Sequence, residues 1–233
     1  MKLFKKIFTS FIYSVYPTKC VCCSKIIDDD KYICSKCENL IERNNLESIC
    51  LHCGLDSNDC VCKYYVYRFN SLVCVFKNEG LAREAYYSYK FGKKQNYDIF
   101  FAKEMSNAVN FCFNDIKFDI ICSVPSSSRF GFDHSGYIAQ KMSDILKIPY
   151  YNNLLSCLKK KTKKQHKSTI KERLINTQGK FACNFNLHNT NILLVDDIKT
   201  TGSTLDECAK ELLFAGADNV YCVTALGSLF NKN

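Results

Sequence analysis

Two adjacent carboxylates and a group of hydroxyls lie in one short stretch of the chain, Asn191–Thr204, whose sequence is NILLVDDIKTTGST. Asp196 and Asp197 can accept hydrogen bonds from a vicinal diol such as the 2′- and 3′-hydroxyls of ribose. Gly202 lets a ligand approach the backbone closely, because glycine has no side chain. The residues of this stretch predicted to contact a ribose-phosphate ligand are Asp196, Asp197, Lys199, Thr200, Thr201, Gly202, Ser203 and Thr204.

The elements on either side of this stretch would position those groups. Ile192–Val195 is a continuous apolar run, which is typical of a buried parallel strand. After the hydroxyls, apolar residues recur at helical spacing from Leu205 to Leu213, and Gly216 ends the pattern. A helix N-terminus offers free backbone N–H groups and a favourable dipole to a phosphate. The order of strand, turn and helix therefore predicts a ribose 5-phosphate site.

Two other interpretations of this stretch remain open. Strands that end in acids also occur in P-loop ATPases, but that fold needs the pattern G-x4-G-K-[ST], which this sequence lacks. The stretch could also be a strand, turn and helix whose acids bind nothing. The close spacing of acids and hydroxyls favours the ligand site over both.

A block of cysteines near the N-terminus has the spacing of metal ligands. Nine of the sixteen cysteines lie between Cys20 and Cys62, mostly as closely spaced pairs. Zinc prefers four such ligands in a tetrahedron, and two C-x2-C pairs complete one structural site. The simplest division gives one site of Cys20, Cys23, Cys34 and Cys37 and a second of Cys50, Cys53, Cys60 and Cys62.

Several features of the cysteine block stay undecided at this point. The C-x-C spacing of the last pair makes the second site the weaker prediction, and crossed pairing, iron–sulfur ligation and disulfides are alternatives. Cys22, next to Cys23, is not expected to bind the metal. Gly54 is expected to help close the turn between Cys50 and Cys53 that it follows. A zinc ribbon of this kind serves either as a structural staple or as a surface for nucleic acid or a partner.

The net charge of +9 is concentrated in one segment. Residues 158–173 hold eight Lys or Arg against one acid, +7 in all, which leaves +2 for the remaining chain. Such a segment could close over an anionic ligand, contact nucleic-acid phosphates, or be a solvated loop. The stretch 1–17 is expected to form a short amphipathic helix on the body, with a membrane-surface helix or an export signal as alternatives.

Further elements are expected between the two candidate sites. Phe118–Val124 has the pattern of another buried strand, followed by a loop that begins at Pro125. A helix over 133–146, a short strand over 148–151 and a helical region over 79–113 complete the expected elements. They predict a mostly parallel, five-stranded α/β core, with the helical region of 79–113 preceding the core strands.

The stretch from Val195 to Thr204 resembles the phosphoribosyl-pyrophosphate (PRPP) motif of type I phosphoribosyltransferases. Together with the cysteine block, it makes almost the whole chain resemble the ComF/GntX family, also called competence protein F-like. Tyr16-Pro17 and Tyr89-Lys90-Phe91-Gly92 fit the family as well, as do Gln165, Arg173, Asn176, Gly179 and Phe181. The stretch 129–134 departs from the family's Arg-Gly-Phe-Asn, which reduces the support for pyrophosphate binding and leaves His134 as a ligand contact or a capping, solvated residue.

This resemblance implies a double zinc-ribbon-like domain over 1–66 and a phosphoribosyltransferase-like domain over 67–233. In the fold it implies, the loop after Phe118–Val124 holds the pyrophosphate, so Ser126 and Arg129 are predicted ligand residues. It also implies structural zinc, Mg²⁺ bound with PRPP, and a cytoplasmic glycosyltransferase of nucleotide metabolism linked to DNA uptake. Asp196 and Asp197 would be the catalytic pair, orienting the ribose and stabilising positive charge. The alternative is a non-catalytic competence protein that binds single-stranded DNA and a helicase partner.

Overall fold

The computed structural model describes residues 17–28, 30–60, 62, 66–92, 97–126, 133–158 and 179–229. The predicted N-terminal helix, Arg129 and all but the first residue of the basic segment 158–173 lie outside these ranges. Within the described part of the chain, no helix is long and apolar enough to cross a membrane.

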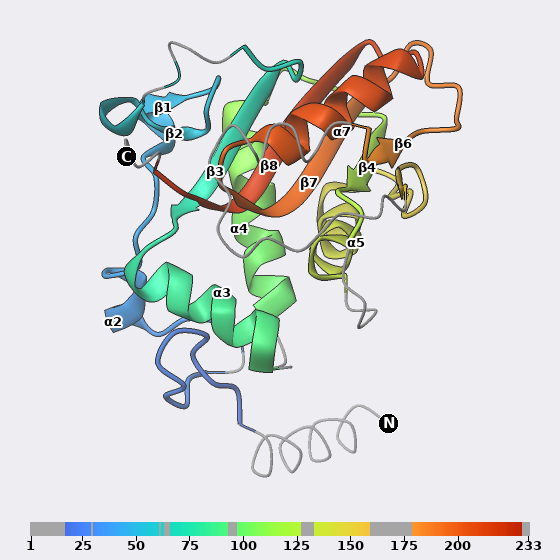
Figure 1. Ribbon diagram of the computed structural model, residues 1–233. Coiled ribbons are helices and arrows are strands. Elements are labelled where there is room, and N and C mark those ends of the chain that lie inside the picture. The colour runs from blue at the N-terminus through green and yellow to red at the C-terminus, as the bar shows by residue number, and fades with distance from the viewer. Residues whose placement is uncertain are drawn as a thin grey trace, which may run out of the picture.

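A parallel sheet of four strands forms the centre of the molecule (Figure 1). Its order is β3 (Ser71–Lys77), β8 (Asn219–Gly227), β7 (Asn191–Lys199) and β4 (Ile120–Ser123). The strands are apolar along most of their length because both faces of the sheet are covered.

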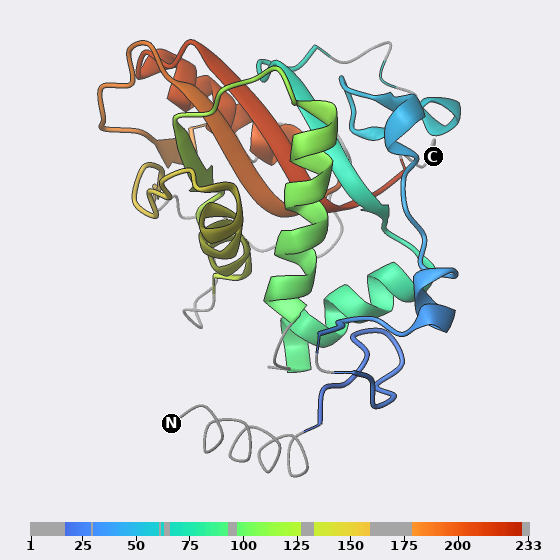
Figure 2. The same ribbon diagram turned by 180° about the vertical axis from the view of Figure 1, so that it is seen from behind.

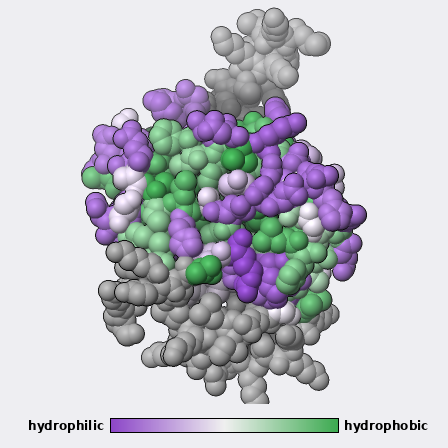
Figure 3. All heavy atoms as spheres, turned by 90° about the horizontal axis from the view of Figure 1, so that it is seen from above, coloured by the Kyte–Doolittle hydropathy of each residue, from purple (hydrophilic) through white to green (hydrophobic). Residues whose placement is uncertain are grey.

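Helices pack on both faces of this sheet (Figures 1 and 2). One face is covered by α3 (Gly80–Gly92), α4 (Tyr97–Cys112) and α5 (His134–Leu146), which share one apolar core with it. The other face is covered by α7 (Ser203–Phe214) and the small antiparallel pair of β5 (Ser156–Cys157) and β6 (Phe181–Ala182). The outer surface alternates between hydrophobic and hydrophilic patches on the side seen in Figure 3.

Two details of the predicted core are wrong. The expected fifth strand over 148–151 is reduced to one parallel bridge between Tyr150 and Ile121 at the edge of β4. The helical region 79–113 does form α3 and α4, but it does not precede the core strands, because β3 comes before it. The apolar run Leu72–Phe76 is the sequence signal for β3.

The cysteine-rich segment has little regular structure of its own. In the described ranges it contains α2 (Ser35–Glu38), two 3-10 turns (Leu46–Ser48 and Ser57–Asp59), and the two-residue strands β1 (Ile49–Cys50) and β2 (Leu55–Asp56). Backbone hydrogen bonds attach it to the edge strand β3: Asn44 donates to Val75 (3.0 Å) and Cys74 donates to Gly54 (3.0 Å). An edge strand has unpaired backbone groups, and this segment covers them. The boundary at 66/67 stays a prediction.

Candidate functional site

The two acids lie near the carboxyl end of β7, within the strand rather than after it. Asp196 is 8% exposed and pairs in register with Thr224 of β8. The hydroxyl of Ser135, in the first turn of α5, donates to Asp196 Oδ1 over 3.2 Å. The carboxyl ends of parallel strands are the usual place for ligands in open α/β sheets. The acid pair therefore lies where a ligand site is expected.

Helix α3 supplies two donors to the second acid. Lys90 Nζ lies 3.1 Å from Oδ2 of Asp197, and the hydroxyl of Tyr86 donates to the same oxygen. Residues four apart lie on one face of a helix, so a single face of α3 holds this carboxylate. The ammonium of Lys90 also lies 5.6 Å from the centre of the Tyr86 ring. We did not assign these roles from the sequence, although Lys90 belongs to the tetrapeptide that fits the family.

Burial and charge drive the two carboxyls in opposite directions. Desolvation, followed by the repulsion of Asp197, raises the pKa of Asp196 well above its ordinary value. Burial alone would also raise the pKa of Asp197, but the charge of Lys90 and the hydrogen bonds from Tyr86 and Lys90 together lower it. In this coupled pair, Asp197 is the carboxyl that ionises first and Asp196 the one that keeps its proton longer.

The hydroxyl-rich turn after the acids is held in shape by buried contacts. Gly202 is the N-cap of α7 with φ 79°, a left-handed conformation that glycine adopts without strain. The buried hydroxyls of Thr201 and Ser203 lie 2.5 Å apart. Tyr67 donates to the carbonyl of Thr201 over 2.9 Å, and its ring lies against Gly202. The turn leads directly from the acid pair into the N-terminus of α7, where the N–H of Ser203 donates to the hydroxyl of Thr201 over 3.3 Å.

The remaining predicted ligand residues are distributed differently. Thr200 is exposed and Thr204 half-buried, whereas Lys199 is only 1% exposed, inside the protein. Ser126 is exposed just after β4, and Arg129 lies outside the described residues.

His134 is neither a cap nor a freely solvated residue. Asp133 caps α5 by accepting from the backbone N–H of Gly136 over 2.9 Å. The ring of His134 packs edge-on against Tyr89, with centroids 4.9 Å apart. Burial and then the charge of Lys90 lower the pKa of His134, so the imidazole favours its neutral form.

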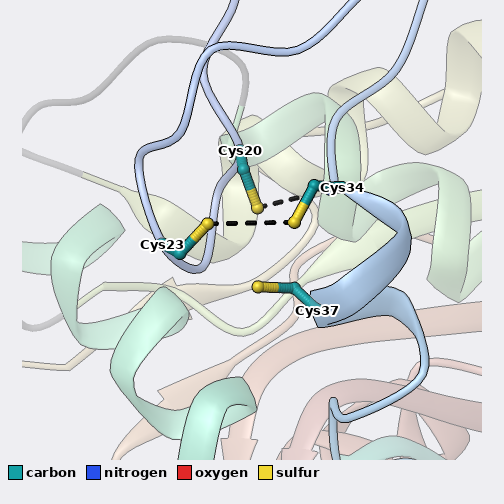
Figure 4. Close-up of side chains that lie close together, drawn as sticks. All are labelled: Cys20, Cys23, Cys34 and Cys37. Carbon is teal, nitrogen blue, oxygen red and sulfur yellow. Dashed lines mark hydrogen bonds between the residues drawn. The ribbon is translucent and has the colours of Figure 1, made fainter.

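The cysteine block forms two compact sets of four thiols, and in each set all Sγ atoms lie within 4.8 Å of one another. The simplest division is the one observed, and crossed pairing is not. The first set is Cys20, Cys23, Cys34 and Cys37 (Figure 4), and the second is Cys50, Cys53, Cys60 and Cys62.

The sulfur positions fit a zinc ion. Zn–S bonds of about 2.3 Å in a tetrahedron place neighbouring sulfurs roughly 3.8 Å apart. The Sγ atoms of Cys23 and Cys34 are 3.8 Å apart, and those of Cys50 and Cys62 are 3.6 Å apart, whereas Cys60 and Cys62 of the C-x-C pair are closer, at 3.1 Å. Cys22 belongs to neither set, as expected. Each set offers four soft donors with no further position for a substrate, so both are candidate structural sites.

No model of a known protein family matches the chain. Among curated proteins, a 95-residue stretch is 32% identical to competence protein F of Haemophilus influenzae. The match covers 40% of this chain and 41% of that protein, so it spans about two fifths of the relative's length. It supports the resemblance to the ComF/GntX family that the sequence shows.

Solved structures similar to the chain include two proteins whose names refer to phosphoribosyl compounds. The purine phosphoribosyltransferase of Pyrococcus horikoshii is 17% identical with a TM-score of 0.37, over 57% of this chain and 89% of that one. Glutamine phosphoribosylpyrophosphate amidotransferase of B. subtilis is 17% identical with a TM-score of 0.37, over 55% of this chain and 25% of that one. The structure confirms the expected α/β class, with a central parallel sheet preceded in the chain by two cysteine clusters.

Proposed function

We propose that the chain binds PRPP or a related ribose 5-phosphate ligand at the acid pair and the turn that follows it. The observation that carries this proposal is the position of two carboxyls with opposite pKa shifts, at the carboxyl end of β7 and just before the N-terminus of α7. A 5′-phosphate would accept from the N–H groups and hydroxyls of Thr200–Thr204. The ribose hydroxyls would bind the two carboxyls.

The opposite pKa shifts suit a diol. Ionised Asp197 accepts a hydrogen bond from one ribose hydroxyl, while Asp196, with its raised pKa, can donate to the other. Because Ser135 and Lys90 already orient these side chains, little reorganisation accompanies binding.

The reaction that this site would support is transfer of the phosphoribosyl group to a nitrogenous acceptor. The bond from C1′ to the pyrophosphate oxygen breaks, an oxocarbenium-like state forms, and the acceptor nitrogen then bonds to C1′. Mg²⁺ would enter with PRPP and neutralise the departing pyrophosphate. Asp197 would stabilise the positive charge that develops on the ribose, so catalysis is electrostatic and positional.

Calorimetric titration tests this proposal, with Mg²⁺–PRPP, ribose 5-phosphate and pyrophosphate as separate ligands. Binding of PRPP and ribose 5-phosphate supports it, and a screen of nucleobase acceptors would then test transfer. Binding of pyrophosphate alone would contradict the ribose assignment.

A second candidate function rests on the similarity to competence protein F. In it, the chain is a transformation accessory protein that binds single-stranded DNA and a helicase partner, with residues 158–173 contributing phosphate contacts. Binding of a labelled oligonucleotide that weakens with salt, and weakens less steeply after Lys→Gln changes in that segment, would support it. An unchanged salt dependence would exclude the segment.

A further inference from the structure

The last residues before β3 contact the start of α7. Tyr67 donates to the carbonyl of Thr201 over 2.9 Å, and a Cβ atom on Gly202 would lie 3.0 Å from Cε1 of its ring. Its neighbour Arg68 binds Asp206, in the first turn of α7, through its backbone N–H (2.6 Å) and through its guanidinium (2.5 Å). Two consecutive residues from another part of the chain therefore hold the hydroxyl-rich turn and the helix that follows it.

The ring of Tyr67 packs against two other rings. The centroid of the His52 ring lies 5.2 Å away, and that of Phe69 lies 4.7 Å away with the two planes 14° apart. Rings at such separations attract each other beyond the effect of the area that they bury. Phe69 is buried in the apolar core on the α7 face. Tyr67 is thus in contact with one ring from the core and with one ring from the turn between Cys50 and Cys53.

His52 occupies the middle of that cysteine turn, and the backbone of the turn is attached to the edge of the sheet. The N–H of Leu72, in β3, donates to the carbonyl of Leu51 over 2.7 Å. The N–H of Gly54 donates to the carbonyl of Cys50 over 2.7 Å, which closes the turn around His52. The residues on both sides of His52 are therefore held, so the position of its ring depends on the form of the turn.

The two cysteine sets differ in what they pack against. Cys53 and Cys62 of the second set lie in the same apolar core as Leu205 of α7. In the described part of the chain, the four cysteines of the first set belong to neither apolar core. Three of them border an open hollow whose lining includes Leu81 of α3. The second set is therefore the one placed to act on the start of α7, and the first set is its natural control.

We propose that His52 is a positioning residue for the hydroxyl-rich turn. Through Tyr67, it holds the carbonyl of Thr201 and the backbone at Gly202 in one form. The state of the second cysteine set therefore reaches the turn, whereas the state of the first does not. The consequence for ligand affinity rests on the proposed ribose-phosphate function, but the order of the turn can be measured with no ligand present.

The first test compares His52→Ala with His52→Phe in the full-length, zinc-loaded chain without ligand. Hydrogen exchange followed by NMR reports opening of the turn at two amides, those of Ser203 and of Asp206, which donates to the carbonyl of Gly202. We expect exchange on the order of tenfold faster at both amides in His52→Ala, nearly original rates in His52→Phe, and unchanged rates in β8. Equal exchange in His52→Ala and the original chain, no recovery in His52→Phe, or equal acceleration throughout β8 would overturn the proposal.

A second comparison tests whether His52 acts through Tyr67. Substitutions at residues that act in series are not additive. His52→Ala should therefore leave exchange at Ser203 unchanged in a chain that already carries Tyr67→Leu. A further acceleration as large as in the original background would mean that His52 acts independently of Tyr67, which contradicts the proposal.

The two cysteine sets are compared in Cys60→Ser and in the matched variant Cys34→Ser, since both thiols are half-buried. We expect exchange at Ser203 on the order of tenfold faster in Cys60→Ser and unchanged in Cys34→Ser, because metal binding orders the segment that holds it. Equal exchange at Ser203 in the two variants would contradict the proposal.

Titration of Mg²⁺–PRPP into the same proteins separates this inference from the proposed function. Affinity should fall on the order of tenfold in Cys60→Ser and stay within about twofold in Cys34→Ser. Faster exchange in Cys60→Ser, with no PRPP binding even by the original chain, would refute the proposed function and support the positioning role. Equal affinity and equal exchange in all three proteins would refute the positioning role and leave the proposed function intact.

Discussion

Lys90 and Asp197 come from elements far apart in the sequence, and their side chains meet at 3.1 Å. Tyr86, one turn earlier on α3, donates to the same carboxylate oxygen. Helix α3 therefore acts on the acid that the ribose would need in its ionised form. The contact joins the helix after the first core strand to the strand that supplies the candidate site.

Replacement of Lys90 by Met should weaken binding of ribose 5-phosphate, on the order of tenfold at neutral pH, through loss of a charge-assisted contact. Without its cation, the pKa of Asp197 would rise. As pH falls, the carboxylate would then be protonated earlier, so ligand binding should be lost at a higher pH than in the unchanged chain. Calorimetric titrations across a pH series measure both effects. Lys90→Arg is the control and should restore most of the affinity. A pH profile identical for Lys90→Met and the original chain would show that Lys90 does not act through Asp197.

Stability should respond in opposite ways to Asp196→Asn and Asp197→Asn. The pKa of Asp196 is higher in the folded than in the unfolded chain. Its stabilising contribution to the free energy of unfolding is therefore present below the unfolded pKa and is lost as pH rises through the folded pKa. The pKa of Asp197 is lower in the folded than in the unfolded chain. Its stabilising contribution to the free energy of unfolding is therefore present above the unfolded pKa and is lost as pH falls through the folded pKa. At neutral pH, Asp196→Asn should therefore raise the free energy of unfolding and Asp197→Asn should lower it. Urea titrations measure both, and changes of the same sign would refute the division of roles.

A side chain at position 202 should destabilise the turn and so lower the free energy of unfolding. Gly202→Ala would place a methyl group about 3.0 Å from Cε1 of Tyr67, in a left-handed conformation. We expect a loss of about 1–2 kcal/mol in unfolding free energy. Tyr67→Phe, which removes only the hydrogen bond to Thr201, should cost about 1 kcal/mol. Chemical denaturation of both variants checks these values, and full stability in Gly202→Ala would mean that the turn is not held in this form.

The cysteine clusters should account for two zinc ions per chain. Cys37→Ser and Cys53→Ser should each remove one ion and lower the melting temperature, because structural zinc contributes folding free energy directly. Cys22→Ser is the matched control, since Cys22 neighbours a ligand but belongs to neither set, and it should retain both ions. Metal analysis and thermal melts give the result. An unaltered melt after complete chelation would count against a structural role.

The parts that were predictable from the sequence depend on residues close together in the chain. The ligand sets follow from cysteine spacing, and the strand, turn and helix around Gly202 follow from local residue patterns. The contacts of Tyr67, Lys90 and Ser135 with the acids and the turn join residues at least 61 positions apart, and no local pattern indicates them. The burial of Lys199 was equally hidden, because nothing in the local sequence distinguishes it from an exposed lysine.

The central claim is that the acid pair and the turn after it bind a ribose phosphate. Its most direct test is calorimetric titration of Mg²⁺–PRPP into the full-length chain and into the double variant Asp196→Asn/Asp197→Asn, after zinc content and folding have been verified for both. We predict a dissociation constant on the order of micromolar for the original chain and no measurable binding for the folded double variant. Equal affinity in the two proteins, or no binding by the original chain, would contradict the claim.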